Sequence, residues 1–124
     1  MIKEKKRYVA FRAYYETESM NSLNSTDIIK WISRFFIEIF GEINAAEANI
    51  TLIEYNEHKK MGIVRIALSQ LDNFRTAMAL IRKYRGNDAR IEIIGVSGTI
   101  KKCREKFILG KKKKQEEEES QISS

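Results

Sequence analysis

Residues 48–68, ANITLIEYNEHKKMGIVRIAL, carry the pattern that decides the fold. Two runs rich in β-branched and aromatic residues, Ala48–Tyr55 and Met61–Leu68, lie on either side of the polar stretch Asn56–Lys60. Two such runs joined by a short polar loop are typical of a β-hairpin. The sequence therefore predicts a pair of antiparallel strands near the middle of the chain.

A strand and a helix are predicted before this hairpin. Residues 7–15, RYVAFRAYY, alternate between two faces as a half-buried strand does. From Asp27 to Phe40 apolar residues recur at helical spacing, and Gly41 follows as a stop signal. Asn24 or Ser25 can cap this helix by accepting hydrogen bonds from its first free amides.

After the hairpin, the pattern predicts a helix, a strand and a third helix. Ser69 is the expected cap of the second helix, whose apolar residues recur at 3.6-residue spacing until Gly86. Ala89–Val96 reads as a fourth strand. In the following segment, Ile100, Cys103 and Phe107 share one side of a helix.

The predicted element order, βαββαβ, is that of a ferredoxin-like α+β domain, the plan shared with RNA-recognition motifs (RRM-like). Two helices would cover one face of a four-stranded antiparallel sheet, and the C-terminal helix is the candidate to cover the other. The domain is expected to span residues 1–110. Residues 111–124 read KKKKQEEEESQISS, and this nearly apolar-free run predicts a disordered charged tail.

The balance of charge favours a polyanionic partner. The 124-residue chain carries a net charge of +6, and because Glu116 to Glu119 lie near its end, residues 1–114 carry +10. Neutralising phosphates with Lys and Arg releases condensed counterions, which favours binding of nucleic acid to such a surface. The alternative is a charge that serves solubility alone.

The inventory of reactive side chains argues against an enzyme active site within this chain. His58 and Cys103 are the only histidine and cysteine, and they lie far apart in sequence. Asp27, Asp72 and Asp88 fall at expected element starts, where carboxylates favour helix dipoles or turns. We therefore predict no catalytic residue and no metal site. A single cysteine and the lack of a long apolar run point to a cytoplasmic protein without a membrane segment.

The aromatic residues do not follow the pattern of an RNA-recognition motif. The strand Gly62–Leu68 contains no aromatic residue, although Tyr8 and Tyr14 of the first strand could stack on bases. Recognition of RNA shape and phosphate is the expectation that follows.

Two longer runs resemble a known family. GEINAAEANITLIEY (Gly41–Tyr55) and IIGVSGTIKKCREKF (Ile93–Phe107) are similar to archaeal ribonuclease P protein component 2. KKRYVAFR, GIVR and FRTAMALI fall in the expected order, so the resemblance covers about residues 5–108. The tail beyond Leu109 is not explained by it.

The resemblance implies a non-catalytic subunit of ribonuclease P, the endoribonuclease that removes 5′ leaders from precursor tRNA. The active site, with its Mg²⁺, would belong to the RNA, and this chain would bind no cofactor. The implied partners are ribonuclease P RNA, precursor tRNA indirectly, and a TIM-barrel-like protein subunit (component 3), in a two-plus-two heterotetramer. A free-standing RNA-binding module, and a ferredoxin-like enzyme or small-ligand regulatory domain, remain as alternatives.

Clustered positive charges mark the expected RNA contacts, in one or two phosphate-binding patches. These residues are Lys5, Lys6, Arg7, Arg12, Arg65, Lys101, Lys102, Arg104 and Lys106. They could also be ordinary solvated side chains.

Two further sites are predicted. Gly95, Ser97, Gly98 and Thr99 form a strand-to-helix junction that either caps the helix or presents amides to an RNA phosphate or a partner carboxylate. The first helix has an unusually wide apolar face, which makes a protein interface at Trp31, Phe36, Ile37 and Phe40 the expectation. The competing explanation for the open sheet face is that the third helix covers it.

Overall fold

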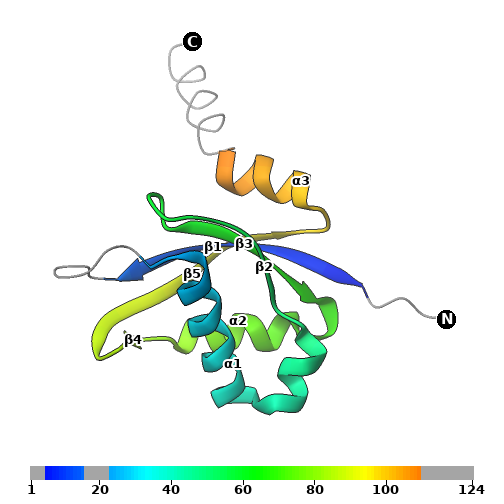
Figure 1. Ribbon diagram of the computed structural model, residues 1–124. Helices are drawn as coiled ribbons and strands as arrows, with labels where there is room; N and C mark the ends of the chain where they lie inside the picture. Colours follow the sequence, from blue (N-terminus) through cyan, green and yellow to red (C-terminus); the bar gives the residue numbers. More distant parts are fainter. Residues whose placement is uncertain (1–4, 16–22, 110–124) are drawn as a thin grey trace, which may run out of the picture.

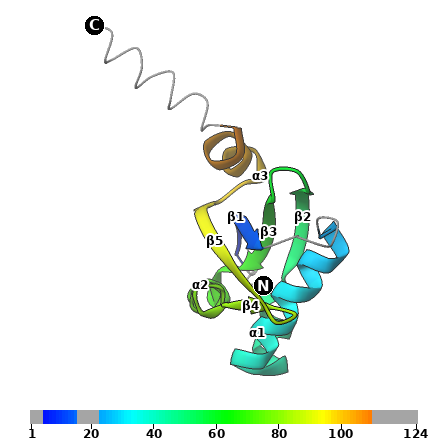
Figure 2. The same ribbon diagram turned by 90° about the vertical axis from the view of Figure 1, so that its left-hand side faces the viewer.

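The chain folds into one antiparallel sheet with two helices on one face and one on the other (Figures 1 and 2). This computed structural model describes residues 5–15 and 23–109, so the tail predicted to be disordered, residues 111–124, lies outside the described residues. The described elements are β1 (Lys6–Tyr15), α1 (Ser25–Ala48), β2 (Thr51–Asn56), β3 (Met61–Ala67), a 3₁₀ turn (Leu68–Gln70), α2 (Leu71–Leu80), β4 (Lys83–Tyr84), β5 (Asn87–Ser97) and α3 (Ile100–Cys103), which continues as wider π-type turns over Arg104–Leu109.

The sheet order β2-β3-β1-β5-β4 confirms the ferredoxin-like α+β prediction. It also corrects the number of strands, because β4 adds a two-residue strand at one edge. Arg85 and Gly86, which join β4 to β5, both have positive φ, 49° and 84°. This is the backbone that a two-residue hairpin turn requires. The predicted end of the second helix at Gly86 is therefore wrong: α2 ends at Leu80, and Gly86 serves the hairpin.

Strand β1 lies at the centre and is hydrogen-bonded to β3 on one side and β5 on the other. Its alternation is as predicted. Val9, Phe11 and Ala13 are buried beneath α1 and α2, whereas Ala10 is buried on the opposite face. Each large apolar side chain buried in this way contributes about 1.5–3 kcal/mol to folding.

Helix α1 begins at Ser25, two residues before the predicted start at Asp27, and continues past its predicted end. The Asn24 side chain accepts a hydrogen bond from the amide of Asp27 at 2.9 Å, which confirms the cap. Gly41 breaks the helical backbone with φ 86° and ψ 169°, yet helical conformation resumes and runs to Ala48. Gly41 is thus a kink rather than a stop.

A buried polar group holds the second part of α1. Gln70 is only 5% exposed, and its side-chain amide donates to Asn44 at 3.1 Å and to Glu47 at 2.9 Å. Satisfying a buried amide in this way avoids a large desolvation penalty. The residue Ser69, predicted to cap the second helix, lies inside the 3₁₀ turn, and no side chain of the described residues caps the start of α2.

The C-terminal helix covers part of the second sheet face, as predicted. Ala10, Ile63 and Cys103 are fully buried between the helix and the sheet, and Phe107 packs at their edge. Figure 1 shows α3 across the sheet from α1 and α2. The chain therefore covers this part of the sheet face with its own helix, and no protein partner is needed there.

Phe107 sits directly on a glycine of β5. A Cβ atom added to Gly95 would lie 2.2 Å from the Phe107 ring, far inside contact distance. Burial, and secondarily the charge of Glu54, raise the pKa of the neighbouring Cys103 thiol to about 11. Its reactivity therefore depends on α3 staying in place.

We predict that Gly95→Ala forces Phe107 away from the sheet and destabilises the fold by about 1–3 kcal/mol, the usual cost of overpacking. The rate at which a thiol reagent modifies Cys103 should rise at the same time. Chemical denaturation and thiol modification at pH 8 measure the two effects.

Gly98→Ala is the matched control, because a Cβ there meets nothing within 4 Å. In the Phe107→Ala background, Gly95→Ala should cost little. An equal cost in both backgrounds would show that Phe107 is not the obstacle.

Candidate nucleic-acid interface

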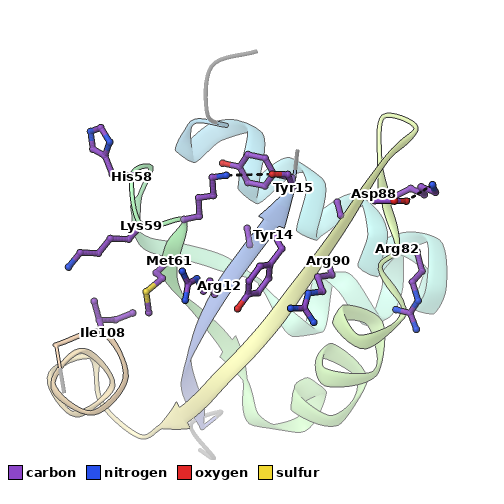
Figure 3. Close-up of a pocket in the computed structure, with 14 residues that line it drawn as sticks. Arg12, Tyr14, Tyr15, His58, Lys59, Met61, Arg82, Asp88, Arg90 and Ile108 are labelled. Carbon is purple, nitrogen blue, oxygen red and sulfur yellow. Dashed lines mark hydrogen bonds and ion pairs between the residues drawn. The ribbon is translucent and has the colours of Figure 1, made fainter. Parts of the chain in front are cut away.

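Where α3 no longer covers the sheet, the same face opens into a groove of about 1190 Å³, shown in Figure 3. Strands β1, β3 and β5 supply its centre, the β2–β3 turn and β4 its sides, and the end of the C-terminal helical segment its lower edge. We call this the basic groove. Its lining residues are Arg12, Ala13, Tyr14, Tyr15, His58, Lys59, Lys60, Met61, Arg82, Lys83, Asp88, Ala89, Arg90 and Ile108.

Positive charge dominates the groove. Among the described residues that line it, six are Lys or Arg, and Asp88 is the single acid. Asp88 is paired with Lys83, whose Nζ lies 2.5 Å from its carboxylate. The concave, cationic surface is of the kind that concentrates polyanions.

Of these cations, the sequence predicted only Arg12 as an RNA contact. The other five come from the β2–β3 turn, the link between α2 and β4, β4 itself and β5: Lys59, Lys60, Arg82, Lys83 and Arg90. The strand register brings them together: Arg12 pairs with Met61 of β3, and Tyr14 pairs with Arg90 of β5. No periodicity in the sequence signals this arrangement.

An aromatic ring lies at the centre of the groove between two arginines. The guanidinium carbon of Arg90 is 4.1 Å from the centroid of the Tyr14 ring, and that of Arg12 is 5.4 Å from it. In Figure 3 the Tyr14 ring lies between these two side chains. Both distances are within the range of a cation–π contact.

Lys60 and Tyr15 contact each other at one side of the groove. The Lys60 ammonium lies 4.3 Å from the Tyr15 ring centroid and donates to the Tyr15 carbonyl at 3.5 Å. The hydroxyls of Tyr15 and Tyr55 are 3.3 Å apart. Burial, followed by this hydrogen bond, raises the pKa of Tyr55 well above its usual range.

The predicted phosphate contacts do not gather into one patch. Arg12 lies in the basic groove, whereas Lys5 and Lys6 lie at the other end of β1, near the β3 partner residues Ile66 and Ala67. Lys101, Lys102 and Lys106 are exposed on the C-terminal helical segment; we call these three lysines the α3 patch.

Three predicted RNA contacts have other environments. Arg104 donates two hydrogen bonds to one oxygen of Glu54, at 2.6 and 2.9 Å, so its charge is already partnered. Arg65 lies opposite Tyr8 in the sheet, and its Nε is buried without a hydrogen-bond partner among the described residues. Arg7 is half-buried, and its guanidinium donates to the Lys6 carbonyl at 2.9 Å.

Two of the four residues predicted at the strand-to-helix junction have structural roles. Gly95 accommodates Phe107, and the Thr99 hydroxyl accepts a hydrogen bond from the Lys102 amide at 3.1 Å, as expected of a cap. Ser97 pairs with Tyr8 across the sheet, and Gly98 is exposed. Caps of this kind satisfy free amides without a ligand.

The residues of the predicted protein interface divide between core and surface. Phe36 has no exposed surface, and Trp31, 7% exposed, packs against Tyr84 with ring centroids 4.9 Å apart. Phe40 is half-buried against Phe36, and Ile37 is 38% exposed. Only the last two can therefore meet a partner without unfolding the helix layer.

In the part of the chain that the structure describes, no helix is long and apolar enough to cross a membrane. The same residues contain no group of three or more His, Cys, Asp or Glu side chains placed to hold a metal ion. His58 is exposed in the β2–β3 turn, and its backbone amide donates to the Asn56 side chain at 3.0 Å.

Fold and groove together define a small, basic α+β domain of the ferredoxin-like class. Within that class the chain belongs to the Rpp14/Pop5 family, described as RNase_P_Rpp14, whose model matches residues 7–108. The match spans both of the runs that carried the resemblance.

Curated relatives agree with this assignment. The chain is 37% identical over 107 residues to ribonuclease P protein component 2 of Methanococcus aeolicus, covering 86% of this chain and 75% of that one. The protein of the same name from Pyrococcus furiosus is 33% identical, with 86% of each chain covered. That from Methanocaldococcus jannaschii is 33% identical over 113 residues, 91% of this chain and 80% of the relative.

A solved structure shares the fold. One chain of the cryo-EM structure of yeast ribonuclease MRP superposes with a TM-score of 0.64, covering 100% of this chain and 99% of that chain. At 12% sequence identity this likeness supports the architecture alone.

The acid in the groove offers a test of its electrostatics. The hydrogen bond and charge of Lys83 hold the pKa of Asp88 below its usual value. We predict that Lys83→Met returns this pKa to the ordinary range, as followed by NMR titration of the carboxyl carbon. Because the pKa is depressed, any stability from the pair is present above the ordinary Asp pKa and disappears as the pH falls through the depressed value.

High salt should shrink the shift, because both side chains are largely exposed. Arg85→Met, in the adjoining hairpin turn, is the matched control and should leave the Asp88 titration in place. An Asp88 pKa unchanged by Lys83→Met would contradict the assigned pairing.

Proposed function

We propose that this chain is a non-catalytic protein subunit of ribonuclease P that binds the ribonuclease P RNA and a second protein subunit. In this role it supports RNA-catalysed removal of 5′ leaders from precursor tRNA, in the cytoplasm. Family membership carries the proposal, since the relatives over most of the chain are named as ribonuclease P protein component 2. The Mg²⁺ of the reaction is assigned to the active site of the RNA.

Two cationic surfaces support the RNA-binding part of the proposal. The α3 patch projects three exposed lysines from a short helix, and the basic groove lies beside the end of that helical segment. Phosphate contacts of this kind fix orientation without reading sequence. A folded RNA that followed both surfaces would be held across the uncovered side of the sheet.

The exposed apolar residues of α1 support a protein contact. Ile37, Ile39 and Ile43 are 38%, 42% and 80% exposed, a large apolar exposure for one helix. Such surfaces commonly mark protein interfaces. We assign this side to the TIM-barrel-like subunit, in a two-plus-two assembly, which leaves the sheet side for RNA.

The RNA contact is tested by the triple variant Lys101→Ala, Lys102→Ala, Lys106→Ala. We expect weaker binding of ribonuclease P RNA, and a plot of log affinity against log salt that is shallower by about one unit per lysine that contacts a phosphate. Fluorescence anisotropy over a salt series measures both quantities.

The matched control removes three exposed positive charges from the helix side: Lys30→Ala, Arg34→Ala, Arg75→Ala. It should change affinity much less. Equal losses in the two triple variants would mean that overall charge, not the α3 patch, governs binding.

The protein contact is tested by thermal melts of the chain alone and with the barrel-like subunit. Binding to the folded state should raise the midpoint, by the equivalent of about 2.7 kcal/mol at a partner concentration 100 times Kd. Ile37→Asp should reduce both this shift and comigration on size-exclusion chromatography.

Leu68→Asp is the matched control, because Leu68 is also 38% exposed but lies outside α1. An unchanged midpoint with no comigration of the unmodified chain would refute the protein contact.

A further inference from the structure

Tyr14 occupies a position that core packing does not explain. Of the tyrosines on β1, Tyr8 packs against the cluster beneath α3, and Tyr15 packs against the main core. Tyr14 belongs to neither cluster and is half-buried in the basic groove. Its close neighbours are instead the two arginines that flank its ring.

Those arginines are free to bind an anion as far as the described residues show. Neither Arg12 nor Arg90 forms an ion pair with a described carboxylate, in contrast to Arg104 and Lys83. Strand pairing sets their placement, because Arg12 precedes Tyr14 by two residues on the same face and Arg90 is its cross-strand partner. The three side chains thus form a preset group of one ring and two planar cations.

We propose that this group binds an unpaired segment of RNA, with one base stacked on Tyr14 and its neighbouring phosphates held by Arg12 and Arg90. The proposal rests on the ribonuclease P function proposed above and specifies which form of RNA the basic groove takes. The Arg12 guanidinium lies farther from the Tyr14 ring, at 5.4 Å, and the base displaces it from the ring face. Arg90, at 4.1 Å, stays packed on the ring.

Unpaired RNA fits the groove better than a duplex does. Bases in an A-form helix are stacked on one another and cannot reach an aromatic ring, whereas bases of loops, bulges and ends can. Duplex binding would use the cations alone and leave Tyr14 without a role. The groove volume of about 1190 Å³ also exceeds the ~300–1,000 Å³ of small-ligand pockets, so it has room for more than one nucleotide.

An acidic peptide uses the groove less fully. Carboxylates would pair with the arginines and lysines, but they have no flat apolar surface to stack on the ring. RNA offers phosphates that can pair with the arginines and flat bases that can stack on the Tyr14 ring. This favours RNA over protein as the occupant.

The test measures binding of the full chain to a labelled unpaired oligonucleotide of about 10 nucleotides and to a duplex of equal length. Tyr14→Leu should weaken binding of the unpaired oligonucleotide about 5- to 150-fold, the equivalent of the ~1–3 kcal/mol that one stacked base contributes. The salt dependence should stay the same, because no charge is removed. Tyr14→Trp should retain the affinity.

The arginines should give the complementary result. Arg12→Met with Arg90→Met should make the salt slope for the unpaired oligonucleotide shallower by about 0.7 for each phosphate that these arginines neutralise. Tyr84→Leu is the matched control, since Tyr84 carries Arg85 over its ring at 5.3 Å outside the basic groove. It should leave binding of the oligonucleotide unchanged, and circular dichroism confirms that each variant is folded.

The outcomes separate this proposal from the broader one. The stacking site is refuted if Tyr14→Leu binds the unpaired oligonucleotide as tightly as the unmodified chain does. It is also refuted if the variant loses as much affinity for the duplex as for the unpaired oligonucleotide. Neither result contradicts binding to ribonuclease P RNA. Competition by a polyglutamate peptide as strong as that by the oligonucleotide would also overturn it, by showing a general polyanion site. Failure of the unmodified chain to bind ribonuclease P RNA refutes the proposed function instead.

Discussion

Strand β1 must be buried on both faces along its middle, and the rest of the structure follows from that requirement. Val9 and Phe11 need the α1–α2 layer, whereas Ala10 needs α3. Since α3 and its continuation extend only from Ile100 to Leu109, they cannot cover the full length of a ten-residue strand. The end of β1 that carries Arg12 and Tyr14 is therefore left open on one face.

The placement of polar groups follows the same division. Beneath α3 the sheet buries Ala10 and Ile63, with Tyr8 packed against them, and Gly95 has no side chain, so that Phe107 can approach. Beyond α3 it presents arginines and a tyrosine, which tolerate water on one side. The length of α3 relative to β1 thus determines which part of this sheet face is packed and which part is open to solvent.

The sequence predicted the elements whose signals are local. Alternation along residues 7–15, the Asn24 cap and the apolar side of the last helix each depend on neighbours within a few positions. One misread part depends on a distant contact: the helix continues past Gly41, where Gln70 binds its second half. The other is local, because Gly86 lies in the two-residue turn between β4 and β5, and its turn signal was interpreted as a helix stop. The groove could not be predicted because its parts meet only through pairing between distant segments: Arg90 lies opposite Tyr14 across β1 and β5, and the Ala13 amide of β1 donates to the Lys60 carbonyl of the β2–β3 turn.

The groove is built mainly on paired strands, and this has a consequence for the speed of binding. Arg12, Tyr14 and Arg90 are fixed by hydrogen-bonded neighbours on both sides of β1, so no loop has to close before an anion is held. Encounter should then be governed by diffusion under long-range attraction, and it should slow steeply as ions are added. Differences in affinity among ligands would then come from differences in their dissociation rate constants.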